Sequence, residues 1–411
     1  MTPLEALDEL WQALRDHYPM LEYAGALDDE WAEALRPALR AAVDLDAAYP
    51  HLARLVARLN DYHTRLEYPG RPGPRPRAPV RLGWIDGGLA VRSATTPDGG
   101  PAPGEAVLRL DGVPAADAFA AALAAAHGAT PWTRLRDACR RLEEGDAGSV
   151  LELETDSGRH RLVRPAQSPD PSPGPPSLTW AAEDIALLRV PAWGGMEAGA
   201  FVAHLDAVLE AARDCPHLIV DVRGNGGGSD ALADACTGRF ARRAVVASIS
   251  FWRRAKTNLF ERTVEVCEPR GPWRYTGRFA VLIDEGCASA CEHFVSGMEA
   301  AGACLVGMPT SGACGWMQRI PLQSGATLVC SRSLPLHGQT ASPQNGIPPH
   351  YQAPPTRDDL RYGVDTALQT ATAWLRGGRP RPAAHGLTWP EPGPAAARLN
   401  ETDHQHGEET T

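Results

Sequence analysis

The chain has 411 residues, of which 43% are hydrophobic and 22% charged, so it can build a packed core and general disorder is excluded. At this length two or three structural units are expected. The net charge of −10 argues against a protein that binds nucleic acid through bulk charge and against a polybasic membrane anchor. No leader pattern opens the sequence, and no apolar run reaches the roughly 18–20 residues of a membrane span. A soluble, cytoplasmic protein is therefore predicted.

The first 66 residues are predicted to be helical. Leucines and a tryptophan recur at helical spacing from residue 4 to residue 14. A second helix is expected from about residue 28 and a third over 51–59. The third ends shortly before His63, so this histidine is predicted to lie in a loop. The proline-rich residues 69–79 are expected to break regular structure, because proline fixes φ and lacks an N–H donor.

A β-rich unit is expected over residues 80–165. Short strands are predicted at 89–91, 106–110, 150–154 and 160–163, with turn residues between them. An alanine-rich helical insertion falls near 115–145. Residues 168–176 have the composition of a linker, which is assigned to 166–180.

Strands alternate with helices over residues 181–376. Apolar strands are predicted at 185–190, 218–222 and 279–283, and helices at 198–213, from about 229, and at 289–301. This alternation is typical of an α/β unit with a mostly parallel sheet. The Pro/Gly-rich residues 377–411 are expected to be a disordered tail.

A glycine-rich loop follows the strand at 218–222, with four glycines in the five positions from Gly224 to Gly228. Such a loop exposes N–H groups that can bind an anion. The sequence lacks the GxxxxGK[ST] and GxGxxG patterns, which disfavours a nucleotide phosphate as that anion. An oxyanion hole is the alternative use of the same N–H groups.

Ser289 follows the strand at 279–283 and lies where a helix is expected to begin. Taken alone, a helix N-cap is the simpler interpretation of a serine in this position. The same position would also direct the helix dipole and the amide of Ala290 at an alkoxide. Cys287, Cys291 and His293 resemble a set of metal ligands. No fourth ligand follows at zinc-site spacing, so small residues at a helix–strand contact are the favoured interpretation.

Three segments taken together resemble peptidase family S41, the tail-specific or C-terminal-processing proteases with their tricorn-like and interphotoreceptor-retinoid-binding-protein-like branch. The segments are LNDYHT (59–64), DVRGNGGG (221–228) and CASACE (287–292). Residues 302–315 and NGIPP (345–349) resemble two further family segments. The resemblance runs from about residue 5 to residue 375.

The resemblance implies a crotonase-like (ClpP-like) α/β catalytic core at 181–376, preceded by a PDZ-like unit at 80–165. It implies a serine hydrolase that cleaves a peptide or protein substrate through an acyl-enzyme on Ser289 and needs no metal or cofactor. His63 is the implied general base. The implied oxyanion donors are the amides of Ala290 and of Gly226 or Gly227.

The sequence departs from the family pattern at several positions. Ala313 stands where the processing-protease branch has its lysine, and the sole lysine, Lys256, lies in an unrelated segment. A Ser–Lys dyad is therefore not expected. The acid that orients the histidine in the tricorn-like branch has no counterpart, and Gln344 is the nearest residue to that position. In addition, Tyr62 replaces a glycine and His350 an aspartate.

Two alternatives keep the same fold. One is a specialised acyl transferase or peptide-maturation enzyme, and the other is a non-catalytic protein that binds a peptide or an apolar ligand. The presence of both Ser289 and His63 favours an enzyme. A homo-oligomer stays open, whereas nucleic-acid and membrane partners are not expected.

Overall fold

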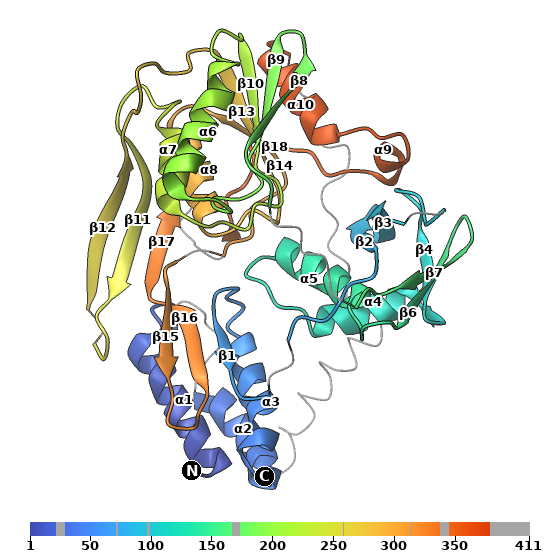
Figure 1. The fold of residues 1–411 in the computed structure, drawn as a ribbon. Helices are drawn as coiled ribbons and strands as arrows, with labels where there is room; N and C mark the ends of the chain where they lie inside the picture. The colour runs from blue at the N-terminus through green and yellow to red at the C-terminus, as the bar shows by residue number, and fades with distance from the viewer. Residues whose placement is uncertain are drawn as a thin grey trace, which may run out of the picture.

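The structure, a computed structural model, describes residues 1–21, 29–70, 73–96, 99–166, 173–257, 259–313, 315–337 and 345–378. Figure 1 shows an α/β unit, a helical layer beneath it and a β-rich unit beside it. Most of the linker at 168–176 and nearly all of the tail at 377–411, both predicted from composition, lie outside these ranges.

A six-stranded sheet forms the centre of the α/β unit. Its strand order is β18 (Tyr351–Gln352), β14 (Cys304–Gly307), β13 (Arg278–Ile283), β10 (His217–Asp221), β9 (Ile185–Arg189) and β8 (Ser177–Ala182). All neighbours are parallel except β8 and β9, which form an antiparallel pair. The mostly parallel α/β sheet predicted from the sequence is confirmed.

Helices cover both faces of this sheet (Figure 1). The helices are α6 (Ala198–Glu210), α7 (Asp230–Thr237) and α8 (Ala290–Ala300) on one face and α10 (Thr366–Leu375) on the other, with the short α9 (Arg357–Arg361) before it. Along β10, Leu218 and Val220 pack toward the first three helices and Ile219 packs toward α10. Because both faces are covered, the central strands are continuously apolar.

The N-terminal helices pack on a second, three-stranded sheet. The elements are α1 (Pro3–His17), α2 (Asp29–Ala41), α3 (Leu45–Ala57), β1 (Arg65–Glu67), β16 (Thr327–Ser331) and β15 (Met317–Pro321). Leu10, Leu52 and Leu328 are buried in one shared core. The third helix begins ahead of the predicted residue 51, because Asp44 caps it by accepting the N–H of Ala47.

The β-rich unit has its own apolar core. It contains β2 (Val80–Ile85), β3 (Gly88–Ala94), β4 (Val107–Leu110), β5 (Val113–Pro114), α4 (Ala115–Ala124), α5 (Pro131–Glu143), β6 (Val150–Thr155) and β7 (Arg159–Val163). The expected short strands and helical insertion are present. Its identity as a PDZ-like unit stays a prediction.

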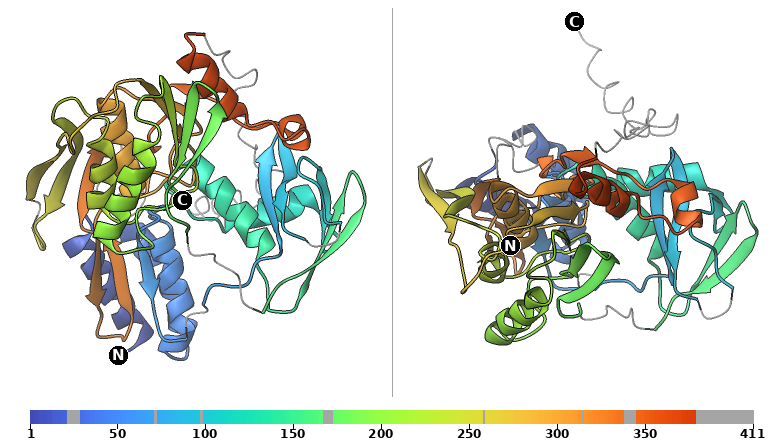
Figure 2. Two further views of the ribbon diagram at one scale, coloured as in Figure 1. Left: turned by 45° about the horizontal axis from the view of Figure 1, so that its top comes forward. Right: turned by 90° about the horizontal axis from the view of Figure 1, so that it is seen from above.

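A further three-stranded sheet was not predicted. It consists of β12 (Phe260–Cys267), β11 (Val245–Arg253) and β17 (Ser333–His337), all antiparallel. Figure 2 shows the β11–β12 hairpin at the side of the molecule opposite the β-rich unit. Within the described ranges, no helix has the length and apolar character needed to cross a bilayer.

Candidate active site

Ser289 adopts a strained backbone conformation between β13 and α8. Its φ is 56° and its ψ −125°, a combination that L-residues rarely adopt and that clusters at functional sites. Ser289 occupies the N-cap position of α8, yet its side chain makes no capping hydrogen bond. The N-cap interpretation therefore does not account for this serine. A strained strand-to-helix turn that exposes a hydroxyl is instead the geometry of a nucleophile.

Backbone hydrogen bonds hold this turn on two sides. The N–H of Ser289 donates to the carbonyl of Ala313 at 2.7 Å, and the N–H of Ser311 donates to the carbonyl of Cys287 at 2.9 Å. On the other side, the N–H of Ala288 donates to the carbonyl of Asn225 at 3.1 Å. The strained conformation is thus fixed by the segment that follows β14 and by the glycine-rich loop.

The side chain of Asn225 organises the glycine-rich loop, a role that the sequence analysis missed. Asn225 is fully buried; its amide nitrogen donates to the carbonyl of Val190 at 3.1 Å, and its amide oxygen accepts the N–H of Gly227 at 2.9 Å. A polar residue inside a run of glycines was the available signal. Asp284 adds a second link, because its carboxylate accepts the N–H of Gly224 at 2.7 Å.

The glycine-rich loop packs directly against the serine turn at Gly227. Gly227 has a φ of 104°, and a Cβ atom there would lie 2.8 Å from the Cβ of Ser289 and 2.7 Å from the carbonyl oxygen of Ala288. Only a glycine allows both this backbone conformation and this close approach.

Two backbone amides remain for an oxyanion. The sequence left Gly226 and Gly227 as alternatives, and the N–H of Gly227 is taken by Asn225. Neither Gly226 nor Ala290 donates its N–H to a protein acceptor in the described part of the chain. The geometry therefore favours the pair Gly226 and Ala290, with Ala290 as the first residue of α8.

His63 lies in a loop that Asp61 holds. The carboxylate of Asp61 accepts the backbone N–H of His63 at 2.9 Å, the hydroxyl of Thr64 at 2.5 Å and the hydroxyl of Ser331 at 3.2 Å. These contacts fix the backbone of the loop rather than the imidazole ring. The ring is buried, and its Nδ1 has no hydrogen-bond partner within the described ranges. This is the nitrogen that the carboxylate of a serine-protease triad would engage.

Two neighbouring segments link the His63 loop to the serine turn. One follows β14 and contains Ala313 and Gly315, and the other is the end of β16 at Ser331. The carbonyl of Ala313 accepts the amide of the serine, and two residues later Gly315 lies against Ser331, where an added Cβ would be 3.2 Å from the hydroxyl oxygen. Ser331 in turn donates to Asp61 in the His63 loop. Residues far apart in the sequence are thereby brought to one region.

The remaining predicted residues lie elsewhere or outside the described ranges. Gln344 falls in the segment 338–344, which the structure does not describe. Lys256 lies in the β11–β12 turn, where its N–H donates to the carbonyl of Asp16 at the end of α1. His350 accepts the N–H of Leu305 at 2.9 Å, a structural contact in the sheet.

Glu292 is a second residue whose role the sequence analysis missed. Its buried carboxyl group accepts the hydroxyl of Thr310 at 2.6 Å and the N–H of Gly312 at 2.8 Å, so it supports the segment that holds the serine turn. Burial raises the pKa of Glu292 to about 7, although these hydrogen bonds lower it. A carboxyl group three residues after the serine, on the same helix, was the signal for this role.

Replacing Glu292 by glutamine is expected to flatten the pH dependence of stability. The pKa is raised to about 7 in the folded state from an ordinary value of 4.5, so the folded state holds this proton more tightly than the unfolded state. The resulting stabilisation is present below the ordinary value and is lost as the pH rises through about 7. Urea unfolding from pH 5 to pH 8 should show a smaller loss of stability in Glu292→Gln than in the unsubstituted protein. The exposed Glu152→Gln is the control, and an unchanged slope in Glu292→Gln would contradict this assignment.

The thiols of the two cysteines beside Ser289 make contacts within the protein core. The thiol of Cys287 donates to the carbonyl of Val222 at 3.2 Å, and burial together with the thiol of Cys291 raises its pKa well above the ordinary value. His293 instead pairs with Asp234, at 2.8 Å from Nε2 to the carboxylate. Across the described ranges, no cluster of His, Cys, Asp and Glu has the arrangement of a metal site.

Comparison with known proteins finds structures of similar fold. The structure resembles that of mature CPAF, with 17% identity, 92% of this chain and 99% of that chain covered, and a TM-score of 0.72. It also resembles a putative peptidase from Parabacteroides merdae (17% identity, 91% and 97% covered, TM-score 0.58). A third similar structure is the photosystem II D1 C-terminal processing protease (16% identity, 86% and 93% covered, TM-score 0.51).

At these identities the likeness shows a shared fold, and no curated protein matches the chain. Residues 184–353, which carry the glycine-rich loop and the serine turn, match the model of peptidase family S41. This part of the chain therefore belongs to peptidase family S41.

Proposed function

We propose that this S41 peptidase cleaves peptide bonds through an acyl-enzyme on Ser289, with His63 as general base. The observation that carries the proposal is the backbone of Ser289, held at a φ of 56° against the glycine-rich loop with no capping role for its side chain.

The chemistry follows from these groups. His63 takes the hydroxyl proton of Ser289 as the oxygen attacks the peptide carbonyl carbon. The amides of Gly226 and Ala290 stabilise the oxyanion that forms, and the N-terminus of α8 adds a favourable dipole. The protonated imidazole then gives its proton to the leaving amine. Water attacks the resulting ester with His63 again as base, which releases the second product and restores the serine.

Covalent labelling with a fluorophosphonate tests this assignment. Mass spectrometry of the adduct is expected to place the label on Ser289, and the Ser289→Ala variant should lose both the label and hydrolysis. A label on Cys287 or Cys291, with Ser289→Ala still active, would contradict the assignment. Failure of the folded protein to react would favour the non-catalytic alternative.

The missing acid leads to a further prediction for Gln344. Where an amide replaces the carboxylate of a serine triad, kcat falls on the order of 10⁴-fold, because the imidazolium formed during attack loses its counter-charge. If Gln344 occupies the orienting position, Gln344→Glu should raise hydrolysis of a generic peptide ester by at least roughly tenfold, a fraction of that effect. An unchanged rate, with the unsubstituted protein already fast, would show that the acid comes from elsewhere.

An acyl transferase on the same fold remains the second candidate, favoured by the unpartnered Nδ1 of His63. Efficient turnover would then depend on a substrate that supplies extra binding energy. Product analysis in the presence of an added amine distinguishes transfer from hydrolysis. A cytoplasmic location and self-association are further proposals, which rest on the sequence alone.

A further inference from the structure

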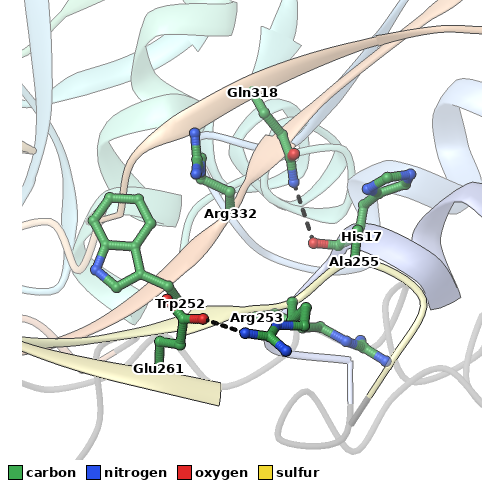
Figure 3. Close-up of a pocket in the computed structure, with 8 residues that line it drawn as sticks. His17, Trp252, Arg253, Ala255, Glu261, Gln318 and Arg332 are labelled. Atoms are coloured by element: carbon green, nitrogen blue, oxygen red, sulfur yellow. Dashed lines mark hydrogen bonds and ion pairs between the residues drawn. The ribbon is translucent and has the colours of Figure 1, made fainter. Parts of the chain in front are cut away.

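A cavity of about 300 Å³ lies at the turn end of the β11–β12 hairpin, outside the proposed catalytic groups (Figure 3). The end of α1, the hairpin, β15 and the β16–β17 junction surround it. The lining residues that matter here are His17, Trp252, Arg253, Arg254, Gln318 and Arg332. The volume lies at the lower limit of the roughly 300–1,000 Å³ typical of small-molecule pockets, so it suits a single side chain.

The lining carries an excess of positive charge in a chain whose net charge is −10. Three arginines face one carboxylate, that of Glu261, which Arg254 engages at 2.8 Å. Arg253 donates to the backbone carbonyl of Tyr18 at 2.7 Å. Lys256 follows in the same turn. The cavity thus holds more cations than its own acidic group can neutralise.

Arg332 lines this cavity and has no acidic partner among the described residues. Its guanidinium instead lies over the ring of Trp252, 4.9 Å from the ring centroid. Figure 3 shows the Arg332 side chain between Trp252 and Gln318. Trp316, which is 51% exposed, lies 6.1 Å from Trp252 between ring centroids. A cation over an indole ring suits a carboxylate on a short aliphatic stem.

The backbone connects this cavity to the proposed active site. The N–H of Arg332 donates to the carbonyl of Trp316 at 2.7 Å. Its neighbour Ser331 donates to Asp61, which holds the His63 loop. Trp316 follows the segment in which Ala313 accepts the amide of Ser289. The cavity wall is therefore continuous with both segments that support the catalytic groups.

We propose that this cavity is a specificity subsite that binds an acidic side chain of the peptide substrate, with Arg332 as its charge partner. The proposal rests on the proposed function, because it takes the ligand to be part of a substrate held for cleavage. The chain has a net charge of −10, so it repels an acidic peptide in general. A cationic subsite would therefore select peptides that place an acidic side chain in the cavity over acidic peptides that do not.

The test compares peptides that differ only by glutamate or glutamine, with that residue moved one position at a time along the sequence. At one position, kcat/KM for the glutamate peptide should exceed that for the glutamine peptide about tenfold, and the ratio should fall as salt is added. In Arg332→Gln the ratio should approach one, and Arg332→Lys should retain part of it. Arg262→Gln, which removes the same charge from the exposed strand β12 outside the cavity, should keep the full ratio.

A ratio near one at every position, or a ratio that Arg332→Gln leaves unchanged, would overturn the subsite. Binding to the Ser289→Ala variant separates this outcome from failure of the proposed function. Fluorescence of Trp252 and Trp316 should report tighter binding of the glutamate peptide, and Arg332→Gln should abolish the difference. Such binding without any turnover in the unsubstituted protein would support the subsite and contradict the peptidase mechanism. Tighter binding of inorganic phosphate than of the glutamate peptide would show a free-anion site and overturn the proposal.

Discussion

Replacing His63 by alanine is expected to lower kcat for a peptide ester about 10²–10⁴-fold, whereas Lys256→Ala should leave it nearly unchanged. The physical reason is that His63 is the group proposed to take the hydroxyl proton of Ser289. Lys256 instead contacts the end of α1, where its N–H donates to the carbonyl of Asp16. Stopped-flow or steady-state hydrolysis of the ester measures both variants. The loop should keep its fold in His63→Ala, because the carboxylate of Asp61 accepts the backbone N–H of residue 63 and an alanine there still has this N–H.

The His63→Ala and Lys256→Ala variants distinguish a histidine base from a serine–lysine dyad. Because the backbone contacts of the loop survive in His63→Ala, unfolding should not explain its loss of activity. Circular dichroism and a thermal melt confirm that point. An inactive Lys256→Ala variant beside an active His63→Ala variant would reverse the assignment of the base and point to a serine–lysine dyad.

Gly227→Ala is expected to lower kcat about 10²–10³-fold, an effect comparable to loss of an oxyanion donor. The added methyl group would lie 2.8 Å from the Cβ of Ser289 and 2.7 Å from the carbonyl oxygen of Ala288, and neither neighbour is the end of a flexible chain. The loop or the serine turn must therefore shift. Even a displacement of about 1 Å in an active site can cost 10²-fold.

The matched control is Gly194→Ala, because a Cβ atom on Gly194 meets no atom within 4 Å. It should keep the activity of the unsubstituted protein. Both variants are compared below their melting temperatures, and the fluorophosphonate labelling rate gives a second measure of the intact serine turn. Full activity and normal labelling in Gly227→Ala would show that the loop does not position the oxyanion site.

The sequence alone was sufficient for the elements whose signals are local. The strand, glycine and helix signals around 218–229 and 279–301 gave β10, α7, β13 and α8 within a few residues. Covered parallel strands are apolar throughout and are separated by turns and helices, so each can be recognised without its neighbours. The positions of Ser289 and of the glycine-rich loop follow from the same local signals.

The tertiary structure decided what depends on contacts between distant residues. The β11–β12 hairpin pairs with β17, where Ile249 lies opposite Leu336, and the N-terminal helices share a core with Leu328. No periodicity within either segment encodes such partners. The choice between Gly226 and Gly227 depended on the side chain of Asn225, which accepts the N–H of Gly227. That Nδ1 of His63 has no partner among the described residues could be seen only from all the groups packed around the ring.

What the sequence determined by itself was the chemical inventory: an acidic α/β chain with a candidate serine, a candidate histidine and a loop of exposed amides. Only the tertiary structure showed that Ser289 is strained without capping α8, and that Arg332 lines a cationic cavity beside the segments that hold the proposed catalytic groups. The physical reason is that strain, burial and charge balance are properties of the neighbours a residue acquires on folding. Those neighbours come from chain segments hundreds of residues apart, beyond the reach of any local pattern.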